Sequence, residues 1–183
     1  MKRIILLLLS LLVVLLFSGW GEGIAQQGDS GQIETGPVFR NVNWGMTPEE
    51  VQAVETAAFK RSSKNDDGNK VLYFEPKLFD RHCELAYTFN DSERLIMASY
   101  KLQYGFLNRY EAYQEILTLL TEKYGTPYIE TDYEAIWNTG RCSISLWLDS
   151  YYNLVFIVYM GPEAEEQFRQ KLQKERKKNK EAL

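Results

Sequence analysis

The chain has 183 residues, of which 45% are hydrophobic and 14% aromatic, and its formal net charge is -4. This length is typical of one domain and excludes a multidomain enzyme. A net negative charge argues against a dedicated nucleic-acid-binding protein. The hydrophobic content is sufficient for a packed core, which excludes a globally disordered chain.

The N-terminus has the three-part pattern of a secretory signal. Met1-Lys2-Arg3 is positively charged, residues 4–17 form an apolar run that contains one serine, and Gly23 and Ala25 are small. The apolar run is shorter than the roughly 20 residues of a membrane-spanning helix. We therefore expect a signal peptide over 1–25 and an exported protein, periplasmic or secreted, without a membrane span. The alternative is an uncleaved signal that tethers the protein to the membrane.

Residues 26–37 are polar and rich in glycine, which predicts a flexible leader. The domain is expected over 38–160. In its first part, Thr47 and Glu50 have the spacing of a capping box and Pro48 suits the first position of a helix. The sequence therefore predicts a helix over Pro48–Phe59. Three strands are predicted after it from their β-rich or alternating residues, over 71–75, 83–89 and 95–103.

The second part of the domain follows the same plan. Asn108 and Glu111 have the spacing of a second capping box, and Gly125 is a typical helix stop. Apolar residues recur at helical spacing between them. Three further strands are predicted over 133–137, 142–148 and 154–160.

The two parts align at one offset, since Cys83 and Cys142 lie 59 positions apart and the strand patterns around them coincide. We therefore predict an α+β domain of two tandem helix-plus-three-strand repeats, over about 44–103 and about 106–160. Two repeats are too few for an open solenoid, so the helices are expected on one face of an antiparallel sheet.

Residues 161–183 are highly charged, with acidic residues early and basic residues late. This order complements a helix dipole and predicts a C-terminal helix or tail. Phe168 and Leu172 lie four residues apart and would share one face of that helix.

The two cysteines of the expected mature chain, Cys83 and Cys142, predict one disulfide, because exported proteins fold in an oxidising compartment. The bond would close a loop of about 60 residues and stabilise the fold by about 4 kcal/mol in the chain-entropy model. The alternative is two buried thiols that behave as small apolar side chains.

Patterns typical of catalysis or metal binding are weak in this sequence. His82 is the only histidine, and its neighbour Cys83 would point to the opposite face of a strand. Zinc spacings are absent, and the calcium-like stretch Asn65–Gly68 would put Phe74 at the twelfth ligand position, where it cannot ligate. We therefore expect no metal, no cofactor and no enzyme activity. The alternative is a small hydrolase that depends on His82.

The aromatic content favours binding. Trp147 lies on the polar side of its predicted strand, and Tyr100 and Tyr159 occupy matching places in the two repeats. An aromatic surface on a sheet is a typical site for partner binding. We therefore predict that Trp147, Tyr100 and Tyr159 contact another protein or an envelope component, and that no nucleic acid is bound.

Residues Trp44–Val51 spell Trp-Gly-Met-Thr-Pro-Glu-Glu-Val. This stretch resembles the W-G-M-[S/T]-x-x-E-V start of a family of small exported bacterial domains of unknown function. The order of a helix and strands is similar to the β-lactamase-inhibitory-protein fold and to the small lipoprotein of the outer-membrane assembly machine. The resemblance implies protein binding without catalysis, although this chain lacks the lipoprotein's lipid-attachment cysteine.

Overall fold

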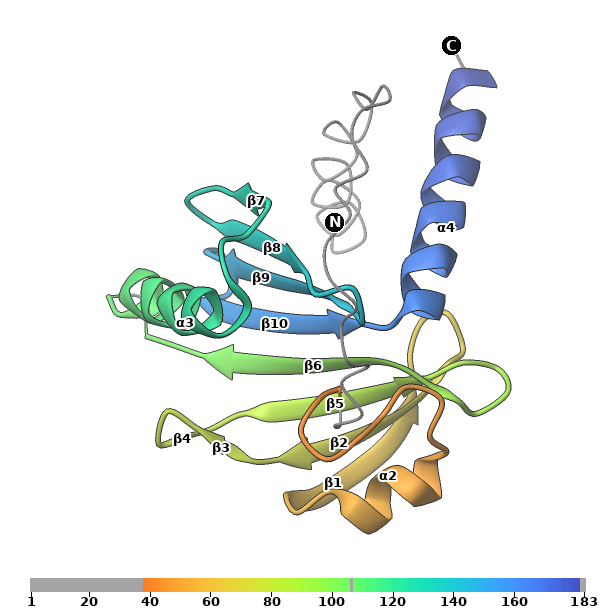
Figure 1. Cartoon of the computed structure of the whole chain (residues 1–183), viewed down its shortest axis with the longest axis horizontal. Coiled ribbons are helices and arrows are strands. Elements are labelled where there is room, and N and C mark those ends of the chain that lie inside the picture. Colours follow the sequence, from red (N-terminus) through yellow and green to blue (C-terminus); the bar gives the residue numbers. More distant parts are fainter. Residues whose placement is uncertain (1–37, 106, 182–183) are drawn as a thin grey trace, which may run out of the picture. The chain divides into compact units, whose positions relative to one another are not determined.

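The computed structural model describes residues 38–105 and 107–181 (Figure 1). The predicted signal peptide and leader lie outside these residues. A compact unit of the chain ends at Arg169, and the residues from Gln170 onward belong to a separate unit.

The described residues form three helices and ten strands. The helices are α2 (Pro48–Val54), α3 (Arg109–Tyr124) and α4 (Pro162–Glu181). The strands are β1 (Ala58–Lys64), β2 (Lys70–Glu75), β3 (Lys77–Leu78), β4 (Arg81–His82), β5 (Glu84–Phe89), β6 (Leu95–Gln103), β7 (Ile129–Glu130), β8 (Glu134–Asn138), β9 (Ser143–Asp149) and β10 (Leu154–Met160).

Eight of these strands form one antiparallel sheet in the order β1-β2-β5-β6-β10-β9-β8-β7, and β3 and β4 form a separate hairpin. The first four strands of the sheet precede α3 in the chain and the last four follow it. The two sets meet where β6 pairs with β10, at the middle of the sheet (Figure 1). The predicted α+β class, antiparallel sheet and C-terminal helix are confirmed.

One face of the sheet, the inner face, carries the core. Leu85 lies opposite Tyr100, which lies opposite Ile157, which lies opposite Leu146, and all four side chains are buried. Helices α2 and α3 add the buried residues Val51, Ala112, Tyr113, Ile116, Leu117 and Leu120 to the same cluster. The residues that lie between these core residues along each strand point to the opposite face, the outer face.

The first helix begins as predicted but ends early. The capping box is confirmed, since Thr47 Oγ1 accepts from the Glu50 amide at 3.3 Å and Glu50 Oε2 accepts from the Thr47 amide at 2.8 Å. The predicted end at Phe59 is wrong, because Glu55 already has an extended backbone. The chain then enters β1, a strand that the sequence did not predict because all seven of its residues are exposed and show no apolar alternation.

The second helix ends as predicted, at Gly125 with φ 83°. Its predicted capping box is wrong, because the Asn108 side chain makes no capping hydrogen bond. The six predicted strands correspond to β2, β5, β6, β8, β9 and β10 within one residue at each end.

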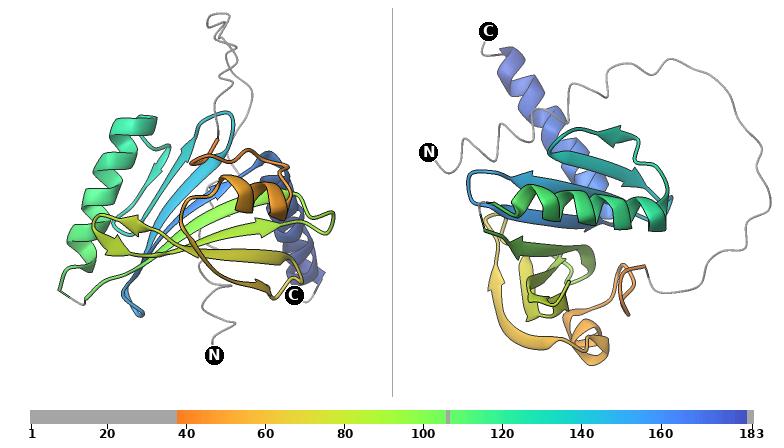
Figure 2. Two further views of the ribbon diagram at one scale, coloured as in Figure 1. Left: turned by 90° about the horizontal axis from the view of Figure 1, so that it is seen from below. Right: turned by 90° about the vertical axis from the view of Figure 1, so that its left-hand side faces the viewer.

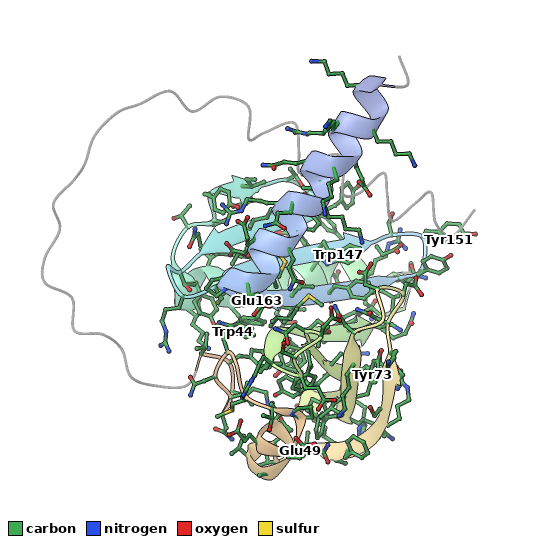
Figure 3. The ribbon with its side chains drawn as sticks, turned by 90° about the vertical axis from the view of Figure 1, so that its right-hand side faces the viewer. Trp44, Glu49, Tyr73, Trp147, Tyr151 and Glu163 are labelled. Carbon is green, nitrogen blue, oxygen red and sulfur yellow. The ribbon has the colours of Figure 1, made fainter. Side chains whose placement is uncertain are left out.

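Trp44 fixes the point at which α4 leaves β10. The Gly161 amide donates to Ile96 O at 2.9 Å, and Trp44 Nε1 donates to Arg141 O at 3.1 Å. A Cβ atom at Gly161 would lie 2.9 Å from Trp44 Cδ2 and 3.1 Å from Ile96 O. Figure 3 shows Trp44 beside Glu163, the second residue of α4. The indole therefore leaves no space for a side chain at position 161.

The first turns of α4 are held to the sheet. Glu163 Oε1 accepts from Asn90 Nδ2 at 2.6 Å, and Ala164 is buried. No helix in the described part of the chain is long and apolar enough to cross a membrane.

We predict that Gly161→Ala lowers the free energy of unfolding by about 1–3 kcal/mol, because the new methyl group overlaps Trp44 and the Ile96 carbonyl. Gly105→Ala is the matched control, since a Cβ atom there has nothing within 4 Å and the residue does not have a positive φ. Urea denaturation of both variants measures the effect. Equal stability of the two variants would contradict the close packing at Trp44.

Candidate functional site

A tight turn at the start of the domain presents Arg40 to the inner face. Phe39 and Val42 exchange backbone hydrogen bonds of 3.3 and 2.9 Å, with Arg40 and Asn41 between them. Arg40 has φ 50°, in the left-handed region that a residue with a side chain seldom adopts. Such strain persists only where surrounding contacts hold the residue in place.

The contacts that hold Arg40 centre on the carboxylate of Glu55. Arg40 Nε and Nη2 donate to the two oxygens of Glu55 at 2.9 and 2.8 Å. Tyr87 Oη donates to Glu55 Oε2 at 2.6 Å, and the Ala57 amide donates to Oε1 at 2.7 Å. The Glu55 side chain is 1% exposed and that of Arg40 is 27% exposed. The ion pair is thus largely buried, and the carboxylate receives four hydrogen bonds.

The pKa values of these groups follow from that geometry. Burial alone would raise the pKa of Glu55, but the hydrogen bonds from Tyr87, Ala57 and Arg40 outweigh it and hold the pKa below its ordinary value. Burial and the hydrogen bond to Glu55 raise the pKa of Tyr87. Glu55 is therefore ionised and Tyr87 protonated at neutral pH.

A cavity of about 380 Å³ lies on the inner face beside Arg40. Tyr100 of β6 and Tyr159 of β10 form its floor, where the two sets of strands meet. Its walls come from the N-terminal turn, the β3–β4 hairpin and α3. In Figures 1 and 2, α3 and the tip of the hairpin lie at the same end of the sheet. The lining residues are Val38, Phe39, Arg40, Leu78, Phe79, Tyr100, Ile116, Leu119, Leu120, Lys123, Tyr124, Ile157 and Tyr159.

The structure does not bring the three predicted binding residues together. Tyr100 and Tyr159 are each 6% exposed and face the cavity. Trp147 lies on the outer face, where it stacks on Phe156 with ring centroids 4.3 Å apart and an interplanar angle of 17°. Figure 3 looks onto this outer face. Trp147 is therefore on the opposite side of the sheet from the two tyrosines.

Two features of the described domain are not predicted by its sequence patterns. Arg40 and Glu55 lie in segments without a recognisable motif, and their pairing depends on the tertiary fold. The free edge of β1 was missed as well, because the strand itself was not predicted. The high local charge of β1, with Lys60, Arg61 and Lys64 in seven residues and no acidic residue, was the available signal.

His82 lies at the surface, in β4, and its side chain is 63% exposed. Its Nδ1 is 3.9 Å from Glu75 Oε2. Cys83, the next residue, is buried in the core. The two side chains therefore do not form a nucleophile and base pair. Among the residues that the structure describes, no group of three or more His, Cys, Asp or Glu side chains is placed to hold a metal ion.

The predicted disulfide is wrong, because Cys83 and Cys142 are both buried free thiols. Cys83 precedes β5 and Cys142 precedes β9, and β6 and β10 lie between those strands. Three strand spacings amount to about 14 Å. A disulfide requires Cα atoms within about 7 Å, so the bond cannot form in this fold. Burial raises the pKa of Cys83 to about 11, which keeps its thiol protonated.

We predict that Glu55→Gln lowers the free energy of unfolding at pH 7 by about 3 kcal/mol, because Arg40 then loses its buried counter-charge. The folded pKa of Glu55 is lowered, so its ionisation stabilises the fold above the pKa of the unfolded chain, about 4.3. That stabilisation is lost as the pH falls through the folded pKa. The variant should therefore show a flatter dependence of stability on pH below about pH 5.

Urea denaturation at pH 7, 5 and 3 measures this dependence. Glu122→Gln, at an exposed position of α3, is the control and should change stability by no more than about 0.5 kcal/mol. If Glu55→Gln and Glu122→Gln have the same effect at every pH, the ion pair does not stabilise the fold.

We also predict that Ellman's reagent finds two thiols in the denatured protein without prior reduction, and that both react slowly in the native protein. Burial of Cys83 and Cys142 is the reason. A mass two units below that of the dithiol form, measured under non-reducing conditions, would contradict the assignment.

In comparisons with known proteins, no family model, no curated protein and no solved structure matches the chain.

Proposed function

We propose that this protein is a non-catalytic protein-binding module that accepts an extended, acidic segment of a partner along the free edge of β1. The observation that carries the proposal is the unpaired edge of this strand. β1 is the terminal strand of the sheet and pairs with β2 alone among the described strands. All seven of its residues are exposed.

The backbone of β1 supplies the affinity in this proposal. An edge strand presents a row of free amide and carbonyl groups, and an added strand satisfies them with a regular ladder of hydrogen bonds. Phe59 supplies an apolar contact on the inner face. It is 49% exposed and packs edge-on against Phe74, with ring centroids 5.5 Å apart. An apolar side chain of the partner would cover the remaining surface of this ring.

The charges of β1 select the partner. Lys60 pairs with Glu75 at 2.6 Å, and Arg61 pairs with Glu84 at 3.1 Å. Lys64 makes no ion pair with a described residue, so its charge is open to a partner. A second copy of β1 in full antiparallel overlap would place Arg61 opposite Arg61, which is unfavourable. The same charges attract an extended segment that alternates acidic and apolar residues.

Three sequence predictions remain part of this proposal. Export would bring the module to partners outside the cytoplasm. The resemblance carried by Trp44–Val51 supports a protein-binding role.

The arrangement of the strands supports a duplication. From the central pair outward, one half of the sheet runs β6-β5-β2-β1 and the other runs β10-β9-β8-β7, and each set of strands follows a helix in the chain. Trp147 and Phe156 would then provide a separate contact surface.

The test uses a pool of synthetic octapeptides in which Asp or Glu alternates with Val, Ile, Phe or Tyr. We expect bound peptides to protect from hydrogen exchange those amides of Ala58–Lys64 that face away from β2, on either side of the register shift between Phe59 and Arg61. Lys64→Glu should weaken binding about fivefold, since it reverses the charge that no described acidic residue neutralises. Binding is measured by fluorescence anisotropy and exchange by NMR.

Lys174→Glu, on the exposed surface of α4, makes the same change in net charge and serves as the control. It should leave peptide affinity unchanged. The proposal fails if no peptide in the pool protects β1, or if the two charge reversals weaken binding equally. His82→Ala addresses the hydrolase alternative, and under this proposal it leaves peptide binding intact.

A further inference from the structure

The cavity on the inner face has the composition of a site for a small anion with an apolar body. Its lining contains two cations, Arg40 and Lys123, and three tyrosines, but no carboxylate. The remaining eight residues are aliphatic or phenylalanine. A concave apolar site with a few convergent polar groups is the usual form of a small-molecule site. This site is separate from β1, and its argument does not depend on the proposed function.

Hydrogen-bond donors in the cavity exceed the acceptors that the protein supplies. Arg40 Nη1 donates to Tyr100 Oη at 3.2 Å, so the hydroxyl hydrogen of Tyr100 is left to donate elsewhere. Nη1 has a second hydrogen, since Glu55 is bonded to Nε and Nη2. The rings of Tyr124 and Tyr159 pack edge-on beside these donors, with centroids 6.5 Å apart. The floor of the cavity therefore presents donors toward its interior.

Lys123 adds a positive charge that is not neutralised. The charge of Arg40 is balanced by Glu55 behind it, at 2.8 Å. Lys123 lies on the last turn of α3, with Nζ 5.0 Å from the centroid of the Tyr124 ring, and makes no ion pair with a described residue. The cavity therefore carries a net positive charge, which favours an anion over a neutral or cationic ligand.

Two of the five described non-glycine residues with a positive φ line this cavity. Arg40 has φ 50°, and Phe79, at the tip of the β3–β4 hairpin, has φ 53°. A left-handed conformation is rare for an aromatic residue, and a two-residue hairpin of this kind normally uses Asn-Gly. Strained residues gather at ligand sites, where their positions are held for binding. Here Phe79 and Arg40, both with a positive φ, line the same cavity from two different walls.

We propose that this cavity binds a monocarboxylate with an unbranched apolar chain. The carboxylate would accept from Tyr100 Oη and Arg40 Nη1, with Lys123 nearby as the counter-charge. The chain would lie among Ile116, Leu119 and Leu120 of α3. The volume of about 380 Å³ holds about a dozen atoms of the size of a water molecule. Decanoate, with ten carbons and two oxygens, matches this size and is the probe.

Isothermal titration of the full chain with decanoate tests the site. We expect a Kd in the micromolar range, and about tenfold weaker binding of decanol, which has no charge. Tyr100→Phe should weaken decanoate binding about tenfold, because it removes a donor from the carboxylate. Lys123→Met should reduce the preference for decanoate over decanol. Lys123→Arg, which keeps the positive charge, should retain this preference.

Leu119→Trp is designed to fill the cavity from an exposed position on α3, and Thr118→Trp is the matched control on the neighbouring residue. The first should abolish decanoate binding and the second should preserve it, while circular dichroism shows both variants folded. The proposal is overturned if decanoate does not bind at about 1 mM, if decanol binds equally well, or if Leu119→Trp binds decanoate like the unchanged protein.

The peptide experiment at β1 and this titration report on different residues. If Leu119→Trp no longer binds decanoate but peptides still protect the β1 amides from exchange, the result supports the cavity as a site separate from β1. Peptide binding with no decanoate binding would reject the cavity and leave the proposed function standing.

Discussion

One buried carboxylate connects the segments of the first half of the fold. Glu55 ends α2, pairs with Arg40 of the N-terminal turn and accepts from Tyr87 of β5. Arg40 in turn donates to Tyr100 of β6. Burial of a charge is costly unless every lone pair finds a donor. A one-residue slip of β5 would turn Tyr87 to the outer face and remove a donor from Glu55.

The position of the cavity follows from the unequal lengths of the two helices on the inner face. α3 has sixteen residues and packs against β9 and β10, whereas α2 has seven. At 1.5 Å per residue, α2 is only about 10 Å long. Residues of the N-terminal turn and of the β3–β4 hairpin line the cavity together with Tyr100 and Tyr159. The cavity lies between these two segments and α3.

The sequence predicts the regular parts of this fold because local patterns determine them. Alternation at Cys83–Phe89 and at Cys142–Leu148 locates strands, and Thr47 and Glu50 locate a helix start. The same patterns miss β1, since an exposed edge strand has no apolar face. They also miss the Arg40–Glu55 pair and the separation of Cys83 from Cys142, which depend on strand order. Strand order is a long-range property, and no spacing in the chain encodes it directly.

The contact between Trp44 and Gly161 has a consequence for synthesis of the chain. Trp44 is among the first residues of the domain to leave the ribosome, but its packing partner is the residue after β10. β6 likewise has an open edge until β10 has been made. The first half is therefore incomplete for most of translation, with an uncovered indole and an unpaired central strand. Such surfaces bind chaperones or other nascent chains. The protein therefore remains prone to aggregation until β10 and Gly161 have been synthesised.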